Sequence, residues 1–303
     1  MGRVVVAGSI NMDVVATADR HPRTGETVAG RAVNFYPGGK GANQAVSASK
    51  LGAPTTLIGC MGRDAFGDQL RAFLAAQGID LSLIRETADA PTGTAIITVA
   101  HADNTIVVIP GANALVGAAD VAQPLLAKGD IAVSQFEIPL PAITAFFQRA
   151  RAAGATTILN PAPAIAFDDA LLDLVDLLIL NETELGELTC TPLDATDGDA
   201  RFIDAARALQ TGRALSICVT LGKRGVLALL DDAPLVIQGR AVNAIDSTGA
   251  GDCFVGAVAA QLAAGKPIRE ALDYANRAAS ISVQRIGASP SMPTAAELAS
   301  EPA

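Results

Sequence analysis

The sequence predicts an α/β fold in which a central, mostly parallel sheet is flanked by helices. Short runs rich in Val, Ile and Leu alternate with alanine-rich helical runs along most of the chain. The helical runs end at a glycine, where a helix commonly needs a left-handed residue. Helix, glycine and strand repeated in this order are typical of βα units around a parallel sheet.

The individual elements follow from this alternation. The chain opens with VVVAG (4–8), which is predicted to be a buried strand. The later helical runs are closed by glycines at Gly52, Gly78, Gly154 and Gly212. The apolar runs TTLIG, TTILN and LSICVTLG follow the first, third and fourth of these glycines and are predicted to be strands.

Two stretches interrupt the alternation, from Asn11 to Tyr36 and from Thr92 to Pro110. Both are rich in Val, Ile and Thr and contain no helical run, so each is predicted to be a hairpin. Paired together they would form a small β lid over 11–36 and 92–110, beside a main domain of 1–10, 37–91 and 111–303. A lid beside the main domain is a common place for an active site. The alternative is that both stretches are edge strands of the main sheet.

Composition limits the function classes. The chain has 303 residues, 50% of them hydrophobic, and a net charge of −9, which argues against a nucleic-acid or membrane surface. The N-terminus lacks the pattern of a signal peptide, and no apolar run is long enough to span a membrane. The cysteines, Cys60, Cys190, Cys218 and Cys253, are far apart, so we expect buried, reduced thiols in a cytoplasmic protein.

The segment YPGGKGANQAV (36–46) combines glycines with polar side chains at the start of a predicted helix. Its glycines let the backbone turn tightly and approach a ligand, while Lys40 and Asn43 add polar reach. The spacing is neither that of a Walker A loop nor GxGxxG, because Gln44 stands at the last position of the latter. The segment predicts a site for a polar ligand; the alternative is a structural turn.

The segment AIDSTGAGDCFVGAV (244–258) places small residues before a predicted helix. Gly249, Ala250 and Gly251 present backbone N–H groups that can hold the charge of a phosphoryl group in transfer. Asp252 follows them and can accept the proton of an attacking hydroxyl. The alternative is that Asp252 is only a favourable charge at a helix N-terminus.

Two further segments follow predicted strands. LILNETELGEL (178–188) delivers Asn181 and Glu184 to a strand end, where they could meet phosphate or water around Mg²⁺. Ordinary helix capping would explain the same residues. VTLGKRGV (219–226) could border a nucleotide through Lys223 and its glycines, or form a routine hairpin.

Taken together, these segments resemble the ribokinase branch of the PfkB carbohydrate kinase family. The similarity covers nearly the whole chain, in the order GSINMD, GGKGANQA, PGANA, LNPAPA, NETE, TLGKRG, DSTGAGD and RIGASPSMP. It implies a Rossmann-like main domain, a small β lid and a homodimer formed through that lid. It also implies ATP as phosphoryl donor with Mg²⁺, activation by K⁺, and phosphorylation of D-ribose at O5. Another sugar or nucleoside, such as 2-deoxyribose or fructose, and a catalytically silent sugar-binding protein are the alternatives.

The resemblance also assigns roles to residues. It implies Asp252 as the catalytic base, beside an anion hole of Gly249, Ala250 and Gly251. The implied sugar site, with Met12 as a neighbour that shapes it, comprises Asn11, Met12, Asp13, Gly39, Lys40, Asn43, Glu137 and Asp252. The implied nucleotide site, with Glu184 near magnesium, comprises Asn181, Glu184, Thr220, Gly222, Lys223, Gly225, Gly251 and Asn276. The implied potassium shell comprises Asp246, Thr248, Ser282, Arg285, Gly287 and Ser291. The chain departs from the family at Asn276, where histidine is common.

Overall fold

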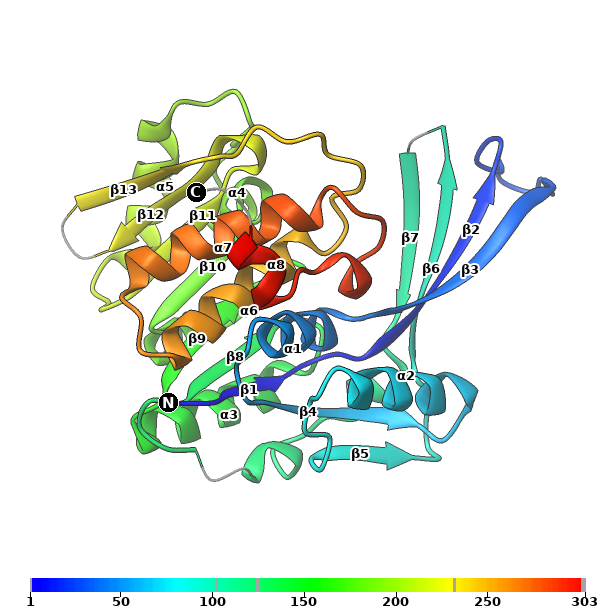
Figure 1. Ribbon diagram of the computed structural model, residues 1–303, viewed down its shortest axis with the longest axis horizontal. Helices are drawn as coiled ribbons and strands as arrows, with labels where there is room; N and C mark the ends of the chain where they lie inside the picture. The colour runs from blue at the N-terminus through cyan, green and yellow to red at the C-terminus, as the bar shows by residue number, and fades with distance from the viewer. Residues whose placement is uncertain (1, 102, 124–125, 231–232, 301–303) are drawn as a thin grey trace.

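The computed structural model describes residues 2–101, 103–123, 126–230 and 233–300. They form a three-layered α/β body from which a small sheet projects (Figure 1). The central sheet has nine strands in the order β13-β12-β11-β10-β9-β8-β1-β4-β5. The run from β11 to β5 is parallel, and β12 and β13 are antiparallel additions at one edge. The predicted fold class, a mostly parallel sheet flanked by helices with a small second sheet, is confirmed.

The strands of the central sheet are β1 (Val4–Ala7), β4 (Thr55–Gly62), β5 (Ile84–Thr87), β8 (Ile131–Gln135), β9 (Thr156–Asn160), β10 (Leu177–Asn181), β11 (Ser216–Thr220), β12 (Gly225–Leu230) and β13 (Ala233–Gln238). The helices are α1 (Lys40–Lys50), α2 (Ala65–Ala76), α3 (Leu140–Ala153), α4 (Glu182–Leu188), α5 (Asp199–Gln210), α6 (Ala250–Ala263), α7 (Ile268–Ser282) and α8 (Ala295–Ser300). The four glycines predicted to close helices all adopt positive φ.

Two apolar layers cover the central sheet, because successive strand residues point to opposite faces. On one face, Val4 and Val6 of β1 pack with α1, α2, α6, α7 and α8. On the other, Val5 and Ala7 pack with α3, α4 and α5. Burial on both faces explains why the strands read as continuous apolar runs rather than alternating ones.

The small sheet consists of β2 (Asn11–Ala18), β3 (Gly30–Gly38), β6 (Gly93–Ala100) and β7 (Asp103–Ile109), in the order β3-β2-β6-β7. Two antiparallel hairpins, β2–β3 and β6–β7, are joined by parallel pairing of β2 with β6. The strands therefore form a sheet of their own, and the alternative of edge strands on the central sheet is excluded. Figure 1 shows this sheet standing away from the body.

The predicted burial of the cysteines is correct at three positions and wrong at one. Cys60, Cys218 and Cys253 are buried, and burial raises the pKa of Cys253 to about 12, so this thiol stays protonated. Cys190 is exposed, because it lies just beyond α4 in a left-handed turn with φ 50°. Within the part of the chain that the structure describes, no helix has the length and apolar character needed to cross a membrane.

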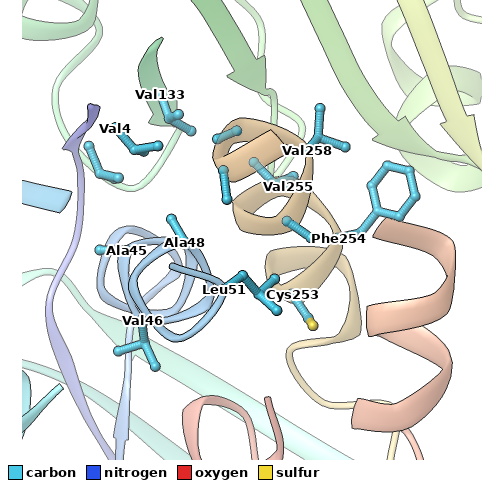
Figure 2. Packing of buried hydrophobic residues seen from close by; sticks show 14 of the residues in the cluster. Val4, Ala45, Val46, Ala48, Leu51, Val133, Cys253, Phe254, Val255 and Val258 are labelled. Atoms are coloured by element: carbon cyan, nitrogen blue, oxygen red, sulfur yellow. The ribbon is translucent and has the colours of Figure 1, made fainter. Parts of the chain in front are cut away.

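Helices α1 and α6 lie side by side over the central sheet, with Val4 and Val133 beyond them (Figure 2). Gly256 of α6 makes the close approach possible. A Cβ atom at this position would lie 2.5 Å from both the carbonyl oxygen of Gln44 and the Cβ of Ser47. The Ser47 hydroxyl also donates a 2.8 Å hydrogen bond to the carbonyl of Cys253. This contact fixes α1 relative to α6.

Replacing Gly256 with Ala should therefore destabilise the fold. Overpacking a tight contact costs about 1–3 kcal/mol, which should lower Tm by roughly 2–8 °C in a thermal unfolding experiment. The control is Gly117→Ala, since Gly117 is not among the glycines with positive φ and a Cβ there would have no described atom within 4 Å. The packing argument fails if both variants unfold at the wild-type temperature.

Candidate active site

The carboxyl edge of the central sheet is unusually polar. Neighbouring parallel strands β8, β9, β10 and β11 end in Gln135, Asn160, Asn181 and Thr220, respectively. The register places Gln135 beside Asn160 and Asn181 beside Thr220. Ligands of open α/β sheets bind beyond the carboxyl ends of the strands, so this edge is the candidate site.

The start of α6 faces this edge. Gly249 is the N-cap residue in a left-handed conformation (φ 73°), and α6 begins at Ala250, which places Asp252 in the first turn. The buried Asp252 carboxylate accepts a hydrogen bond at each oxygen, from Asn43 Nδ2 (2.9 Å) and from Gln44 Nε2 (3.0 Å). A carboxylate is thus held beside the N–H groups of a helix N-terminus, where the helix dipole favours negative charge.

Two adjoining cavities meet at this helix start and share Thr220 and Gly251. The first, about 170 Å³, is mostly polar and is lined by residues that include Lys40, Asn160, Asn181, Glu184, Thr220, Gly249, Gly251 and Asp252. The second, about 290 Å³, is mostly apolar and is lined by residues that include Gly222, Lys223, Gly225, Val226, Val242, Phe254, Asn276, Ala279 and Val283. A polar chamber joined to an apolar one matches a ligand with a charged end and a flat apolar end.

Lys40 supplies the positive charge of the polar cavity. Burial lowers the pKa of its ammonium group, but the carboxylates of Asp252, Glu137, Glu184 and Asp13 outweigh the burial and raise it. Lys40 is therefore a permanent cation among four acids. Because the four carboxylates repel an anion, we expect an anion to bind where backbone N–H groups can donate to it, which is at the start of α6.

Asp13 has the most perturbed carboxyl group of the site. Burial, with the charges of Glu137 and Asp252, raises its pKa to about 7, and Lys40 opposes the shift. Its carboxylate lies against Gly38, where a Cβ atom would come within 2.2 Å of Oδ2. Perturbed acids of this kind are concentrated at functional sites.

Glu137 and Asn11 complete the polar wall next to Asp13. Glu137 Oε2 accepts hydrogen bonds from the Ser9 hydroxyl and from the backbone N–H of Lys40 (3.0 Å). Asn113 accepts from the backbone N–H of Ile10 (2.9 Å) and donates to Asn11 Oδ1 (2.7 Å). These bonds connect the segment after β1, the start of α1 and the loop after β7 to one another next to Asp13.

Asn181 and Glu184 serve two purposes. They form a reciprocal capping box at the start of α4, with both bonds at 2.9 Å, as the alternative interpretation expected. Both also line the polar cavity. Burial raises the pKa of Glu184, against the opposing effects of the Asn181 N–H and Lys40.

Met12 and Asn276 do not line the polar cavity. Met12 is 2% exposed and packs in the apolar core, because it points to the opposite side of β2 from Asn11 and Asp13. The structure therefore does not bring Met12 among the polar side chains. Asn276 lines the apolar cavity, and its amide donates to the carbonyl of Gln238 (2.9 Å).

The residues predicted for potassium lie in two segments, one before α6 and one that begins at the last residue of α7: Asp246, Thr248, Ser282, Arg285, Gly287 and Ser291. Asp246 joins these segments, because Oδ1 accepts from the N–H and hydroxyl of Thr248 (2.9 and 2.6 Å) and Oδ2 from the N–H of Gly287 (2.8 Å). The structure thus brings the two segments together beside the start of α6.

Several site residues had no role in the sequence predictions: Ser9, Gln44, Asn113, Gln135 and Asn160. Gln44 touches Asp252, Ser9 touches Glu137, and Asn113 holds Asn11. All except Gln135 lie in segments that carry the family resemblance, so the signal was present. Their roles depend on pairing between distant segments, which no local pattern contains.

The chain is similar to known carbohydrate kinases in sequence and in fold. The pattern of the pfkB family carbohydrate kinases matches residues 1–295. The chain is 38% identical to a ribokinase of Staphylococcus aureus and 37% identical to one of Bacillus subtilis, with 98% of each chain covered in both comparisons. A ribokinase structure from Arabidopsis thaliana complexed with ribose and ATP superposes with a TM-score of 0.88 at 32% identity, covering 99% of this chain and 98% of that one.

The raised pKa of Asp13 predicts a pH-dependent stability. The ordinary value is 3.8 and the folded value about 7, so the folded state favours the proton; the stabilisation is complete below pH 3.8 and lost as pH rises through about 7. Asp13→Asn removes the charge and should be more stable than wild type by about 2–4 kcal/mol at pH 8, and by much less at pH 4. Chemical denaturation at both pH values measures this. The exposed Asp204→Asn is the control, and a pH-independent gain at position 13 would contradict the assignment.

Proposed function

The chain belongs to the pfkB family of carbohydrate kinases, and we propose that it transfers the γ-phosphoryl group of ATP to the 5-hydroxyl of D-ribose. The observation that carries the proposal is the position of Asp252, beside the N–H groups that begin α6 and on the wall of the polar cavity. The likeness to ribokinases over nearly the full chain supports ribose as the acceptor.

Asp252 acts as the base in this proposal. An aspartate is a weak base, which suffices when the transition state is loose and the proton leaves late. The backbone N–H groups of Gly249, Ala250 and Gly251 hold the charge that develops on the moving phosphoryl group. Lys40 adds a cation to the lining of the cavity, where it neutralises phosphate oxygens.

The sugar lies against the polar wall next to Lys40. Carboxylates and amides suit a ligand rich in hydroxyl groups, since they accept and donate hydrogen bonds in several directions. We assign this role to Asn11, Asp13, Asn43 and Glu137, with Gly39 allowing close approach of the backbone. Gly39 has φ 87°, and a Cβ atom there would lie 2.7 Å from the backbone nitrogen of Asn11.

ATP spans the two cavities. Its base lies in the apolar cavity near Asn276 and the turn from Gly222 to Gly225, and its phosphates reach the polar cavity past Thr220. We place this reaction in the cytoplasm, where ATP is available and reduced thiols persist.

Two metal ions complete the proposal. The carboxylate of Glu184 in the polar cavity fits Mg²⁺, which is commonly held by one or two carboxylates, waters and substrate phosphates. The oxygen-rich loops joined by Asp246 fit a potassium ion. Mg²⁺ would neutralise phosphate charge, and K⁺ would stabilise the loop that carries the start of α6.

Asp252→Asn tests the assignment of the base. Loss of proton acceptance should lower kcat by at least about a hundredfold, while calorimetry should still detect binding of ATP and sugar. The exposed Asp273→Asn on α7 is the control and should keep wild-type turnover. Undiminished turnover by Asp252→Asn would show that another group accepts the proton.

ADP release from MgATP tests the acceptor and the cation. Ribose should support the fastest release in a panel with 2-deoxyribose, fructose, ribulose, adenosine and inosine, and K⁺ should increase the rate over Na⁺. Faster release with another acceptor would retain the kinase chemistry and replace ribose as substrate. The absence of release with every acceptor would favour a sugar-binding protein.

We also propose that the small sheet is a lid that pairs with a second copy of the chain. Its surface carries a group of exposed apolar side chains: Val33, Phe35, Ile96, Ile106, Val107, Val108 and Ile109. All residues of the edge strand β7 are exposed, on both faces. An uncovered apolar edge strand is a liability unless a partner covers it.

Val107→Lys should therefore convert a homodimer into monomers in analytical ultracentrifugation, because Val107 is 63% exposed at this surface. Val236→Lys introduces the same charge at another exposed apolar position, on β13, and should leave the dimer intact. A monomeric wild-type chain, or equal effects of both variants, would refute the proposed interface.

A further inference from the structure

The buried amides around Asp252 form a chain of fixed direction. Asn43 and Gln44 each donate to one carboxylate oxygen. Each amide is held in turn at its own oxygen: the Ser289 hydroxyl donates to Asn43 (2.6 Å), and Gln135 Nε2 donates to Gln44 (2.6 Å). Turning either amide round would break these bonds and aim an oxygen at the carboxylate. The N–H groups are therefore locked toward Asp252.

Gln44 is separated from any ligand. Its side chain is fully buried, and it lines neither of the two cavities that meet at α6. Its amide nitrogen also donates to Asn160 Oδ1 (3.1 Å), and Asn160 donates to the carbonyl of Ile179 on β10 (2.9 Å). Gln44 thus joins Asp252 to the ends of β8 and β9, and it contacts the polar cavity through Asp252 and Asn160.

The arrangement leaves one polar atom unsatisfied. Gln135 Oε1 is buried and has no hydrogen-bond partner within the described ranges of the chain. The atom lies so close to Gly8 that a Cβ atom there would approach it to 2.2 Å. Buried polar groups are rarely left unpaired, and exceptions are concentrated at functional sites. The orientation of Gln135 is explained by the bond that it donates to Gln44.

We propose that Gln44 is a positioning residue for Asp252, and that Gln135 holds it in the orientation that fixes the rotation of the carboxylate toward the acceptor hydroxyl. The inference rests on the proposed function, because it assumes that Asp252 accepts the proton. Two donors, one at each oxygen, prevent the carboxylate from rotating and leave a further lone pair of each oxygen free. A proton acceptor held in this way needs no reorientation when the hydroxyl arrives.

Gln44→Leu tests this role. It removes the donor at nearly constant volume, so kcat should fall by about a hundredfold, while KM for ATP should stay within about twofold because Gln44 lines no cavity. Gln44→Glu should lower kcat by at least as much, since it replaces the N–H that faces Asp252 with a second carboxylate. Gln210→Leu is the matched control: its amide donates to the carbonyls of Leu215 and Leu229, at the opposite end of β11.

A double-mutant cycle separates positioning from a general loss of structure. In an Asp252→Asn background, Gln44→Leu should reduce the residual turnover by less than about threefold, because its effect acts through the missing carboxylate. Gln210→Leu should lower Tm without lowering kcat. The proposal is overturned if Gln44→Leu keeps wild-type kcat, or if its loss of kcat is the same in both backgrounds.

The ADP-release assay distinguishes a wrong acceptor from a wrong role for Gln44. If the wild-type chain does not release ADP with ribose, ribose is wrong as the acceptor, and the Gln44 variants are compared with whichever acceptor in the panel supports release. If no acceptor does, both proposals fall together. Wild-type activity combined with fully active Gln44 variants removes only the positioning role.

Discussion

The close packing of α1 against α6 is the constraint on which the rest of the site depends. Lys40, Asn43 and Gln44 lie on α1, whereas Asp252 lies on α6, and the two helices can approach because Gly256 presents no side chain. The hydrogen bonds to Asp252 are about 3 Å long, so a displacement of one helix by the width of a methyl group would break them. The packing of α1 against α6 therefore also determines the hydrogen-bond geometry at Asp252.

The central sheet supplies the second half of the site. Parallel strands bring their carboxyl ends to one edge, and four neighbours end there in an amide or hydroxyl side chain, Gln135, Asn160, Asn181 and Thr220. Asn160, Asn181 and Thr220 line the polar cavity together with Gly249, Gly251 and Asp252 at the start of α6. Helices and strands therefore position these side chains, and the loops contribute mainly the glycine turns that let the backbone approach a ligand.

Local patterns were enough to predict the fold and the segment around Asp252. Alternating apolar and helical runs with closing glycines predict βα units, and the small residues 249–251 predict the helix start that the structure places at Ala250. The contact between Gln44 and Gln135 joins residues 91 positions apart and could not be predicted in this way. Met12 shows the same limit: the sequence places it between Asn11 and Asp13, whereas the strand turns it into the core. The roles of the site residues stay predictions.

The β2–β3 hairpin of the small sheet is continuous with the polar wall of the candidate site. β2 begins at Asn11 and includes Asp13, and β3 ends at Gly38, two positions before Lys40. The small sheet therefore carries both residues that are proposed to bind the sugar and the exposed apolar surface, and Val108 of that surface lines one cavity together with Asn11 and Glu137. If a second copy covers the exposed apolar surface, part of the ordering that sugar binding requires has already taken place. Self-association and sugar affinity would then be thermodynamically linked, each strengthening the other by the same factor.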